Sequence, residues 1–464
     1  MGALPPGPTS PPLAQTAHWL LAPLEFMDSC ARRYGDAFSV NFLGFQSPMV
    51  MLSNPQAIRA LYAEREQLLP PGRAVALRPI MGPQSLLLLQ GEEHLERRRV
   101  MLPPFHGERL RGFEDQMREI AGTEIAMWPA DVEVELLPRT RAIALEVILR
   151  LVFGVSEHSR LQRLRGLLPS LLDSVSSVAV SFRVLLARRL GRPDPLEGFA
   201  RLRREIDEIL LEDIATRRAT GAERGGDVLS LLLDARFEDG SAMSDRELSD
   251  QLVTLLIAGH ETTATALAWT FDLLTHEPPA LARLAAEVRA GEEDRYLRAV
   301  VAEALRLRPV VPISGRTLAH ELRCGELTLP AGTDVTPAIW LTHTRADLYP
   351  EPLEFRPERF LEESPATYAW IPFGGGVRRC LGAAFAELEM RVVIASVLER
   401  FDLRAARRHR ERVLRRGLTL APRHGSRVRL RPYTRSDQAS PRSSSADSTR
   451  GSAATVRRQE PSAL

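Results

Sequence analysis

Apolar residues recur with the 3.6-residue period of an α-helix over most of this chain. The pattern is clearest in five segments, which span residues 136–153, 198–218, 244–276, 280–307 and 383–400. The alternation typical of strands is confined to residues 37–52, 317–340 and 417–431. The sequence therefore predicts a mainly α fold with a minor β region.

Segment 244–276 has the strongest helix signals. Ser244 and Glu247 match a capping box at its start, and Pro278 with Pro279 stops it. At about 1.5 Å per residue, a helix of this length extends about 50 Å, close to the width of a domain of this size. We expect this helix to cross the core.

The C-terminal end differs in composition from the rest of the chain. From residue 435 onward it is rich in Ser, Ala and Arg and has almost no large apolar residue, so residues 435–464 are predicted to be a disordered tail. No repeat period and no Pro/Gly/Ser-rich linker divides the remainder. We expect one domain over residues 1–434, with an ordered core from about residue 15.

Composition narrows the class of protein. The 464 residues are 44% hydrophobic and 26% charged, which is ordinary for a globular protein. The formal net charge is +2, and the tail, with five Arg against three acidic residues, supplies the whole excess. A body without net charge gives no indication of nucleic-acid binding.

The cysteines and the N-terminus bear on the compartment. Cys30, Cys324 and Cys380 lie far apart and form no CxxC pair, which argues against a disulfide framework or a cysteine zinc site. The N-terminus lacks the basic start and the apolar core of a signal peptide, and no stretch approaches the roughly 18 apolar residues of a membrane span. We expect a cytoplasmic protein without a membrane anchor.

The strongest chemical signal is the loop FGGGVRRCLG at residues 373–382, which presents one cysteine just before a predicted helix. The helix N-terminus, Arg378 and Arg379 are expected to favour the thiolate of Cys380, which is the metal-binding form. The glycines let the backbone approach a flat cofactor, and Phe373 can exclude water. The loop alone leaves open a second interpretation, a buried and inert cysteine after a glycine-rich turn.

This loop resembles the haem-binding signature F-x-x-G-x-R-x-C-x-G of the cytochrome P-450 superfamily. The matching positions are Phe373, Gly376, Arg378, Cys380 and Gly382. The resemblance implies haem b with its iron held by the Cys380 thiolate, an axial ligand that favours O–O cleavage. It also implies the single-domain fold of that family, with the haem between the long helix and the helix after the cysteine.

The resemblance continues upstream with a predicted structural network. Glu303 and Arg306 fit E-x-x-R on a helix, where they share a face, and Arg359 lies in the second arginine segment, PERF. A lone pair of this kind is usually a surface salt bridge worth about 0–1 kcal/mol. In the family the three positions form a buried network that braces the haem loop.

Residues 258–263, AGHETT, resemble the oxygen-activation motif of the family, near the middle of the long helix. Ala258 and Gly259 would leave room for dioxygen, Thr262 would hydrogen-bond it, and Glu261 would relay protons. The alternative is that Thr262 bonds back to a helix carbonyl, as mid-helix threonines commonly do. His260 is expected to be packed or solvated and not an iron ligand.

Three further residues resemble the partners of the two haem propionates. His94 and Arg98 are spaced i,i+4 in the pattern of the second basic helix, and Arg316 follows the E-x-x-R helix. Two carboxylates need such donors. For any single arginine of this Arg-rich chain, a solvated face is the alternative.

The resemblance also places a substrate pocket between the long helix and four variable stretches. They span residues 73–89, 170–186, 310–313 and 418–421, and most of their side chains are aliphatic. We therefore expect a small apolar substrate, such as a fatty acid, a terpenoid or a polyketide-like product of secondary metabolism.

We expect electrons to come from a separate protein, because these residues show no reductase domain and no dinucleotide-binding motif. The resemblance is to soluble bacterial members, which implies a monomer served by a ferredoxin or flavodoxin with its NAD(P)H reductase. Arg97, Arg99 and Arg379 are expected to form a basic face that steers such an acidic donor.

The main hypothesis is thus a monooxygenase that inserts one atom of dioxygen into its substrate. Two alternatives remain open at this point: a haem-thiolate enzyme that uses peroxide, and a haem sensor that does not turn over. A helical scaffold without haem is a third.

Overall fold

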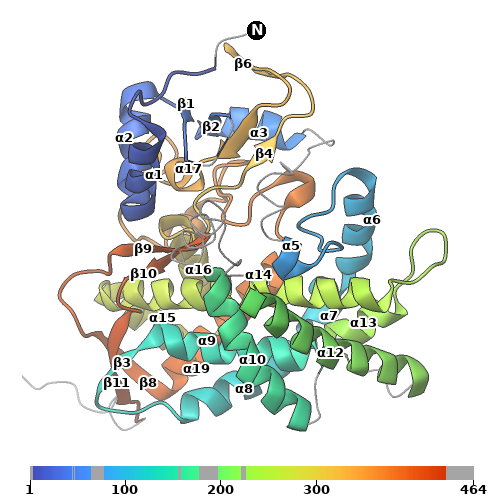
Figure 1. The fold of residues 1–464 in the computed structure, drawn as a ribbon. Coiled ribbons are helices and arrows are strands. Elements are labelled where there is room, and N and C mark those ends of the chain that lie inside the picture. The colour runs from blue at the N-terminus through green and yellow to red at the C-terminus, as the bar shows by residue number, and fades with distance from the viewer. Residues whose placement is uncertain are drawn as a thin grey trace, which may run out of the picture.

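The computed structural model describes residues 4–43, 45, 47–63, 78–154, 158–176, 197–220 and 226–434. Figure 1 shows helices forming most of the molecule, with strands at one end and at one lower edge. The helices are α1 Pro12–Leu21, α2 Pro23–Tyr34, α3 Pro55–Ala63, α5 Arg78–Met81, α6 Gly91–Met101, α7 Gly107–Arg111, α8 Glu114–Ala126, α9 Leu136–Val147, α10 His158–Ser176, α12 Glu197–Thr220, α13 Val228–Asp234, α14 Asp245–Thr275, α15 Pro278–Ala290, α16 Arg295–Leu307, α17 Ile339–His343, α18 Arg359–Glu362 and α19 Ala383–Arg400. The strands are β1 Ala37–Val40, β2 Met49–Leu52, β3 Glu133–Glu135, β4 Arg316–Thr317, β5 Leu322–Cys324, β6 Leu327–Leu329, β7 Asp334–Pro337, β8 Phe401–Ala405, β9 Val413–Arg416, β10 Thr419–Pro422 and β11 Arg427–Pro432.

The long helix α14 crosses the core as the sequence predicts (Figure 1). Its 31 residues extend about 46 Å, and it packs against α9, α12, α16 and α19. The Ser244 hydroxyl accepts the Glu247 N–H at 3.2 Å and so caps the helix. The capping box is only half formed, because the Glu247 carboxylate accepts a hydrogen bond from Arg97 Nε at 2.9 Å.

The other helical predictions hold with one correction. Segment 280–307 is two helices, α15 and α16, because Gly291 adopts a left-handed conformation with φ of +68° and ends the first. Segment 136–153 is α9 followed by one π turn, Ile148–Val152. None of the helices in the described ranges is long and apolar enough to span a bilayer.

The strands form small sheets that hold the ends of the helices. One sheet has the order β1-β2-β7-β4, with β2 parallel to β7 and Val50 opposite Val335. A second has the order β3-β11-β8, and β9 pairs with β10 in a separate hairpin. The sequence pattern missed β3, β8 and β9, and Trp340, expected to end a strand, lies in α17. The predicted tail, residues 435–464, lies outside the described residues.

Candidate active site

The cysteine loop lies between a short turn, Gly376–Arg378, and the start of α19. The Cys380 N–H donates to the Phe373 carbonyl oxygen at 2.9 Å and closes the loop on itself. The Phe373 ring packs edge-on against Trp370, with 6.2 Å between centroids. Cys380 is exposed, whereas Cys30 is buried, so the loop presents Cys380 to a ligand.

The protonation state of Cys380 differs from the expectation. Although its surface is accessible, the thiol lies deep among protein atoms, and this desolvation raises its pKa. The Gly382 N–H and the charges of Arg379 and Arg98 act in the opposite direction but are smaller influences. The protein alone therefore does not favour the thiolate, and a bound metal cation is needed to displace the proton.

Two glycines of the loop pack against Tyr62 of α3. A Cβ on Gly375 would lie 2.5 Å from Tyr62 Cδ2, and one on Gly376 would lie 2.8 Å from the Tyr62 carbonyl oxygen. Gly376 also has a φ of +64°, which favours glycine. At these positions the close approach expected for a flat cofactor is made by another part of the protein.

Basic side chains from three separate elements converge beside this loop. His94 and Arg98 come from α6, Arg316 begins β4, and Arg378 belongs to the loop itself. Arg378 Nη2 donates to the Leu89 carbonyl oxygen at 2.6 Å, while its Nε is buried without a partner among the described residues.

The positive charges of this cluster lie close enough to repel one another. Burial, together with the charges of Arg378, Arg98 and Arg316, lowers the pKa of His94 to about 3, so the imidazole is neutral. Burial and repulsion from Arg316 and Arg98 lower the pKa of Arg378 to about 10. Within the part of the chain that the structure describes, no carboxylate pairs with Arg98 or Arg378. An external group with negative charge would relieve this repulsion.

Helix α14 is buried over most of its length but has a more open stripe near its middle. Ala258 is exposed, and Leu255, Gly259 and Thr262 are half-buried, all on one face. The Thr262 hydroxyl donates to the Ala258 carbonyl oxygen at 2.6 Å, which is the back-bonding alternative. Its oxygen lone pairs remain able to accept from a group bound at the open stripe.

Glu261 lies on a different face of α14 from this stripe. Its carboxylate is buried and receives two hydrogen bonds from Arg141 of α9, from Nε at 2.8 Å and from Nη2 at 2.5 Å. His260 also faces α9, where its Nε2 lies 3.1 Å from the Arg141 carbonyl oxygen. Burial lowers the pKa of His260 to about 4, so it is a packed, neutral histidine as expected.

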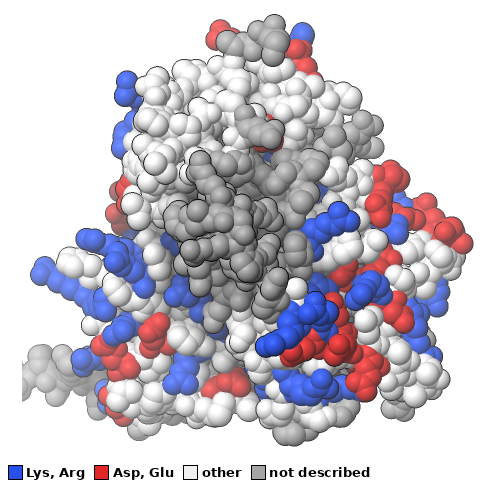
Figure 2. All heavy atoms as spheres, viewed as in Figure 1, with Lys and Arg blue, Asp and Glu red and all other residues white. Residues whose placement is uncertain are grey.

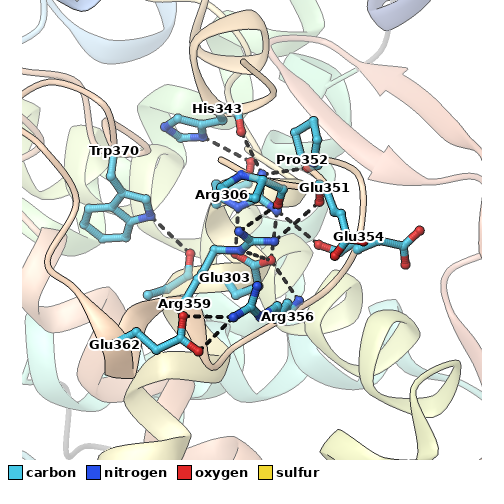
Figure 3. Close-up of polar contacts among 12 residues, drawn as sticks. Glu303, Arg306, His343, Glu351, Pro352, Glu354, Arg356, Arg359, Glu362 and Trp370 are labelled. Atoms are coloured by element: carbon cyan, nitrogen blue, oxygen red, sulfur yellow. Dashed lines mark hydrogen bonds and ion pairs between the residues drawn. The ribbon is translucent and has the colours of Figure 1, made fainter. Parts of the chain in front are cut away.

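Glu303, Arg306 and Arg359 form the predicted network (Figure 3). Glu303 and Arg306 are fully buried and joined by two hydrogen bonds, from Arg306 Nε at 2.6 Å and from Nη2 at 2.8 Å. Arg359 Nε donates to Glu303 Oε1 at 3.0 Å. Arg306 Nη1 donates to the carbonyl oxygens of His343 and Pro352, so backbone groups complete its coordination. The alternative of a surface pair is excluded.

His343, which the sequence pattern did not single out, connects this network to the cysteine loop. Its Nδ1 lies 3.1 Å from the Arg306 carbonyl oxygen, and its Nε2 accepts the Ile371 N–H at 2.8 Å. Nδ1 therefore carries the proton. Ile371 is two residues before Phe373, and Trp370 Nε1 donates to the Ala302 carbonyl oxygen at 3.1 Å. The network thus holds the beginning of the loop from two sides.

Comparison with known proteins bears directly on this arrangement. Residues 5–426 match the cytochrome P-450 family. The chain belongs to this family.

Its relatives cover most of its length. Cytochrome P-450 135B1 of Mycobacterium tuberculosis is 41% identical over 440 residues, which is 92% of this chain and 91% of the relative. Cytochrome P-450 137 of the same organism is 39% identical over 403 residues, 86% of this chain and 84% of the relative. A solved structure of cyanobacterial CYP120A1 with retinoic acid bound has a TM-score of 0.78 and 26% identity, covering 93% of this chain and 99% of that one.

Membership of the cytochrome P-450 family confirms the predicted fold, haem with cysteine thiolate ligation, and monooxygenase activity. It favours the main hypothesis over the haem sensor and the haem-free scaffold. The residues present fit the cofactor: Cys380 is exposed, α14 has an open stripe, and the cluster of Arg98, Arg378 and neutral His94 can bind two carboxylates.

The expected basic face of this cytochrome P-450 is largely neutralised. Arg97 pairs with Glu247 and Glu96, and Arg99 pairs with Glu238. Sequence position alone could not show these pairs, because the glutamates at 238 and 247 are more than a hundred residues away. Because Arg97 and Arg99 are paired with glutamates, they contribute less to attracting an acidic electron donor than expected.

Proposed function

We propose that this monooxygenase oxidises a small apolar substrate with electrons from a separate ferredoxin or flavodoxin and its NAD(P)H reductase. The observation that supports the site is the convergence of His94, Arg98, Arg316 and Arg378 beside the loop of Cys380. This group of arginines beside a neutral histidine suits a cofactor with two carboxylates, because each carboxylate needs such hydrogen-bond donors.

In this proposal each residue of the site has one task. The Cys380 sulfur holds the iron of haem b, and the three arginines with neutral His94 bind its carboxylates. Phe373, Ala258 and Gly259 bound the space around it. When bound, the haem supplies the activation of dioxygen, favoured by the electron-rich thiolate.

We assign proton delivery to Thr262 and Glu261. The Thr262 hydroxyl is on the open stripe of α14 and accepts there while it donates to Ala258. The Glu261 carboxylate is bound to Arg141. To deliver a proton to Thr262, it has to separate from Arg141 or transfer the proton through a water molecule. Arg141 is therefore a positioning residue for Glu261.

An apolar substrate is supported by the stretches near the site. Val310 and Leu420 are buried, and their backbones are joined by a hydrogen bond of 2.8 Å from the Leu420 N–H. The solved structure of CYP120A1 has retinoic acid bound, which is a mostly apolar molecule. Fatty acids, terpenoids and polyketide-like metabolites are the classes to screen first. Residues 73–77 and 177–186 of the expected pocket lie outside the described residues.

The decisive experiment is the absorption spectrum of the reduced protein with carbon monoxide. We expect a strongly red-shifted Soret band in the wild type and its absence in Cys380→Ala. Cys30→Ala is the matched control, because Cys30 is buried in another part of the core. An unchanged spectrum in Cys380→Ala would refute the assigned ligand.

A second experiment separates the proton relay from turnover driven by peroxide. Glu261→Gln should lower product formation about 10²-fold when electrons come from a ferredoxin system, because a positioned acid contributes about that factor. It should lower turnover driven by added hydrogen peroxide much less, since peroxide brings both protons and needs none delivered from solvent. Equal losses in the two assays would show that Glu261 acts only through the fold.

A further inference from the structure

The C-terminal part of the described chain has an excess of positive charge that the haem site does not use. Between residues 403 and 432 there are eleven arginines and one acidic residue, Glu411. Two of these arginines pair with acids elsewhere, Arg410 with Glu277 and Arg427 with Glu133. Six others are exposed and make no ion pair with the described residues: Arg404, Arg407, Arg408, Arg412, Arg423 and Arg429.

The distribution of charge over the surface is correspondingly uneven. Figure 2 shows basic side chains gathered at the left edge, over the β9–β10 hairpin and the loop that precedes it. Over α12 and α13, at the right, basic and acidic side chains alternate. The neutral net charge of the body therefore hides a basic edge.

Exposed apolar side chains lie beside this basic edge. Helix α1 contains no charged residue and exposes 64% of Leu13 and 83% of Leu21, which share one face with Ala17. The neighbouring loop exposes 48% of Leu43 and 42% of Phe45. These residues leave an unusual amount of large apolar surface in water.

Helix α1 packs against the hairpin that carries part of the basic edge. The Arg415 guanidinium of β9 lies 5.5 Å from the centre of the Trp19 ring of α1. The hairpin itself exposes 37% of Leu414 and 65% of Leu418. Helix α1, residues 42, 43 and 45, and the segment 404–418 together form what we call the arginine–leucine edge.

We propose that the arginine–leucine edge adsorbs reversibly to the surface of an anionic lipid bilayer. Arginines at such a surface bind lipid phosphates, and leucines enter the boundary between headgroups and acyl chains. A nucleic acid would satisfy the arginines but not the leucines. A purely apolar protein partner would leave the arginines desolvated without a counter-charge. An anionic bilayer takes both kinds of side chain, because its headgroups carry the counter-charge and its acyl region accepts the leucines.

The test is sedimentation of the haem-loaded protein with vesicles. We expect binding to an equimolar mixture of phosphatidylglycerol and phosphatidylcholine at low salt, and little binding to phosphatidylcholine alone. Arg408→Glu with Arg412→Glu should weaken binding about tenfold or more, because both arginines are exposed and unpaired. Arg109→Glu with Arg111→Glu, exposed on α7, is the matched control and should bind like the wild type.

A second variant tests the apolar half of the proposal. Leu21→Ser should also weaken binding to the anionic vesicles, while the spectrum of its reduced carbon monoxide complex shows that the haem site is intact. Failure of the wild type to sediment with anionic vesicles would overturn the proposal. So would equal weakening by the two double variants, or full binding by Leu21→Ser, because the first indicates non-specific charge and the second excludes insertion.

Discussion

Two clusters of arginine flank the cysteine loop, and they differ in how their charge is compensated. Around Glu303, every buried cation has a partner from the chain: Arg306 and Arg359 share the carboxylate and bind nearby carbonyl oxygens. Around His94, Arg98 and Arg378 have no carboxylate partner among the described residues. The first cluster is complete as a protein structure, whereas the second is suited to a ligand that brings its own negative charge.

Under the proposed function, this difference separates residues that stabilise the fold from residues that bind the cofactor. A buried charge whose partner is removed destabilises a protein strongly, so a self-contained network must be present whenever the protein is folded. Uncompensated buried cations cost stability until a ligand with negative charge binds to them. Arginine occurs in both clusters, so residue type alone does not distinguish them.

The largest expected effect comes from breaking the complete cluster. Glu303→Gln leaves fully buried Arg306 without its carboxylate and should lower the free energy of unfolding by about 3–5 kcal/mol. Urea unfolding of the haem-loaded protein, followed by tryptophan fluorescence, measures this change. Glu205→Gln is the control, because Glu205 forms an exposed pair with Arg201 and should change stability by less than about 1 kcal/mol. Similar losses in both variants would remove the distinction between the clusters.

A smaller effect on stability but a clear effect on haem is expected in the second cluster. Arg98→Leu should speed haem transfer to a haem-binding acceptor protein about 10- to 100-fold, since a hydrogen bond to a charged group contributes about 1.5–3 kcal/mol. Arg99→Leu is the matched control, because Arg99 is next in α6 but exposed and paired with Glu238. Unchanged haem transfer in Arg98→Leu would mean that the cluster does not bind the cofactor.

The smallest expected effect is on how the free energy of unfolding depends on pH. It depends on His343, which contacts Arg306 in the first cluster. Burial lowers the pKa of His343 to about 3 from an ordinary value of 6.5, with a further contribution from Arg306. Between these values the unfolded chain binds more protons than the folded one, so the free energy of unfolding falls as the pH falls from about 6.5 toward 3.

The slope for one such histidine is at most about 1.4 kcal/mol per pH unit. His343→Gln should flatten the dependence of the unfolding free energy on pH, whatever it does to stability at neutral pH. His409→Gln, a substitution at an exposed histidine, is the matched control. A steeper slope in His343→Gln would contradict the assigned neutral state.

The local sequence predicted a helix correctly where residues at the ends of that helix set its limits. The limits of α14 and α19 follow from Ser244, Pro278 and the glycine before Ala383, and both helices form as predicted. The local sequence did not show where a single residue interrupts a long apolar pattern. Gly291, for example, divides the segment 280–307 into two helices. Short strands such as β3 lack enough residues to show a period, so their pairing with β11 defines them.

The sequence by itself indicated the family, Cys380 as the candidate ligand of the haem iron, and the order of the motifs around it. These features depend on residue type and spacing within one segment, which are visible without a fold. Only the tertiary structure showed that Glu261 pairs with Arg141, that Tyr62 fills the space beside Gly375, and that His343 connects the buried network to the cysteine loop. These contacts join residues far apart in the chain, and nothing in the local pattern encodes which of the 61 basic residues will meet which acid. Packing makes that choice, because burial removes water and leaves each charge dependent on whatever the fold brings next to it.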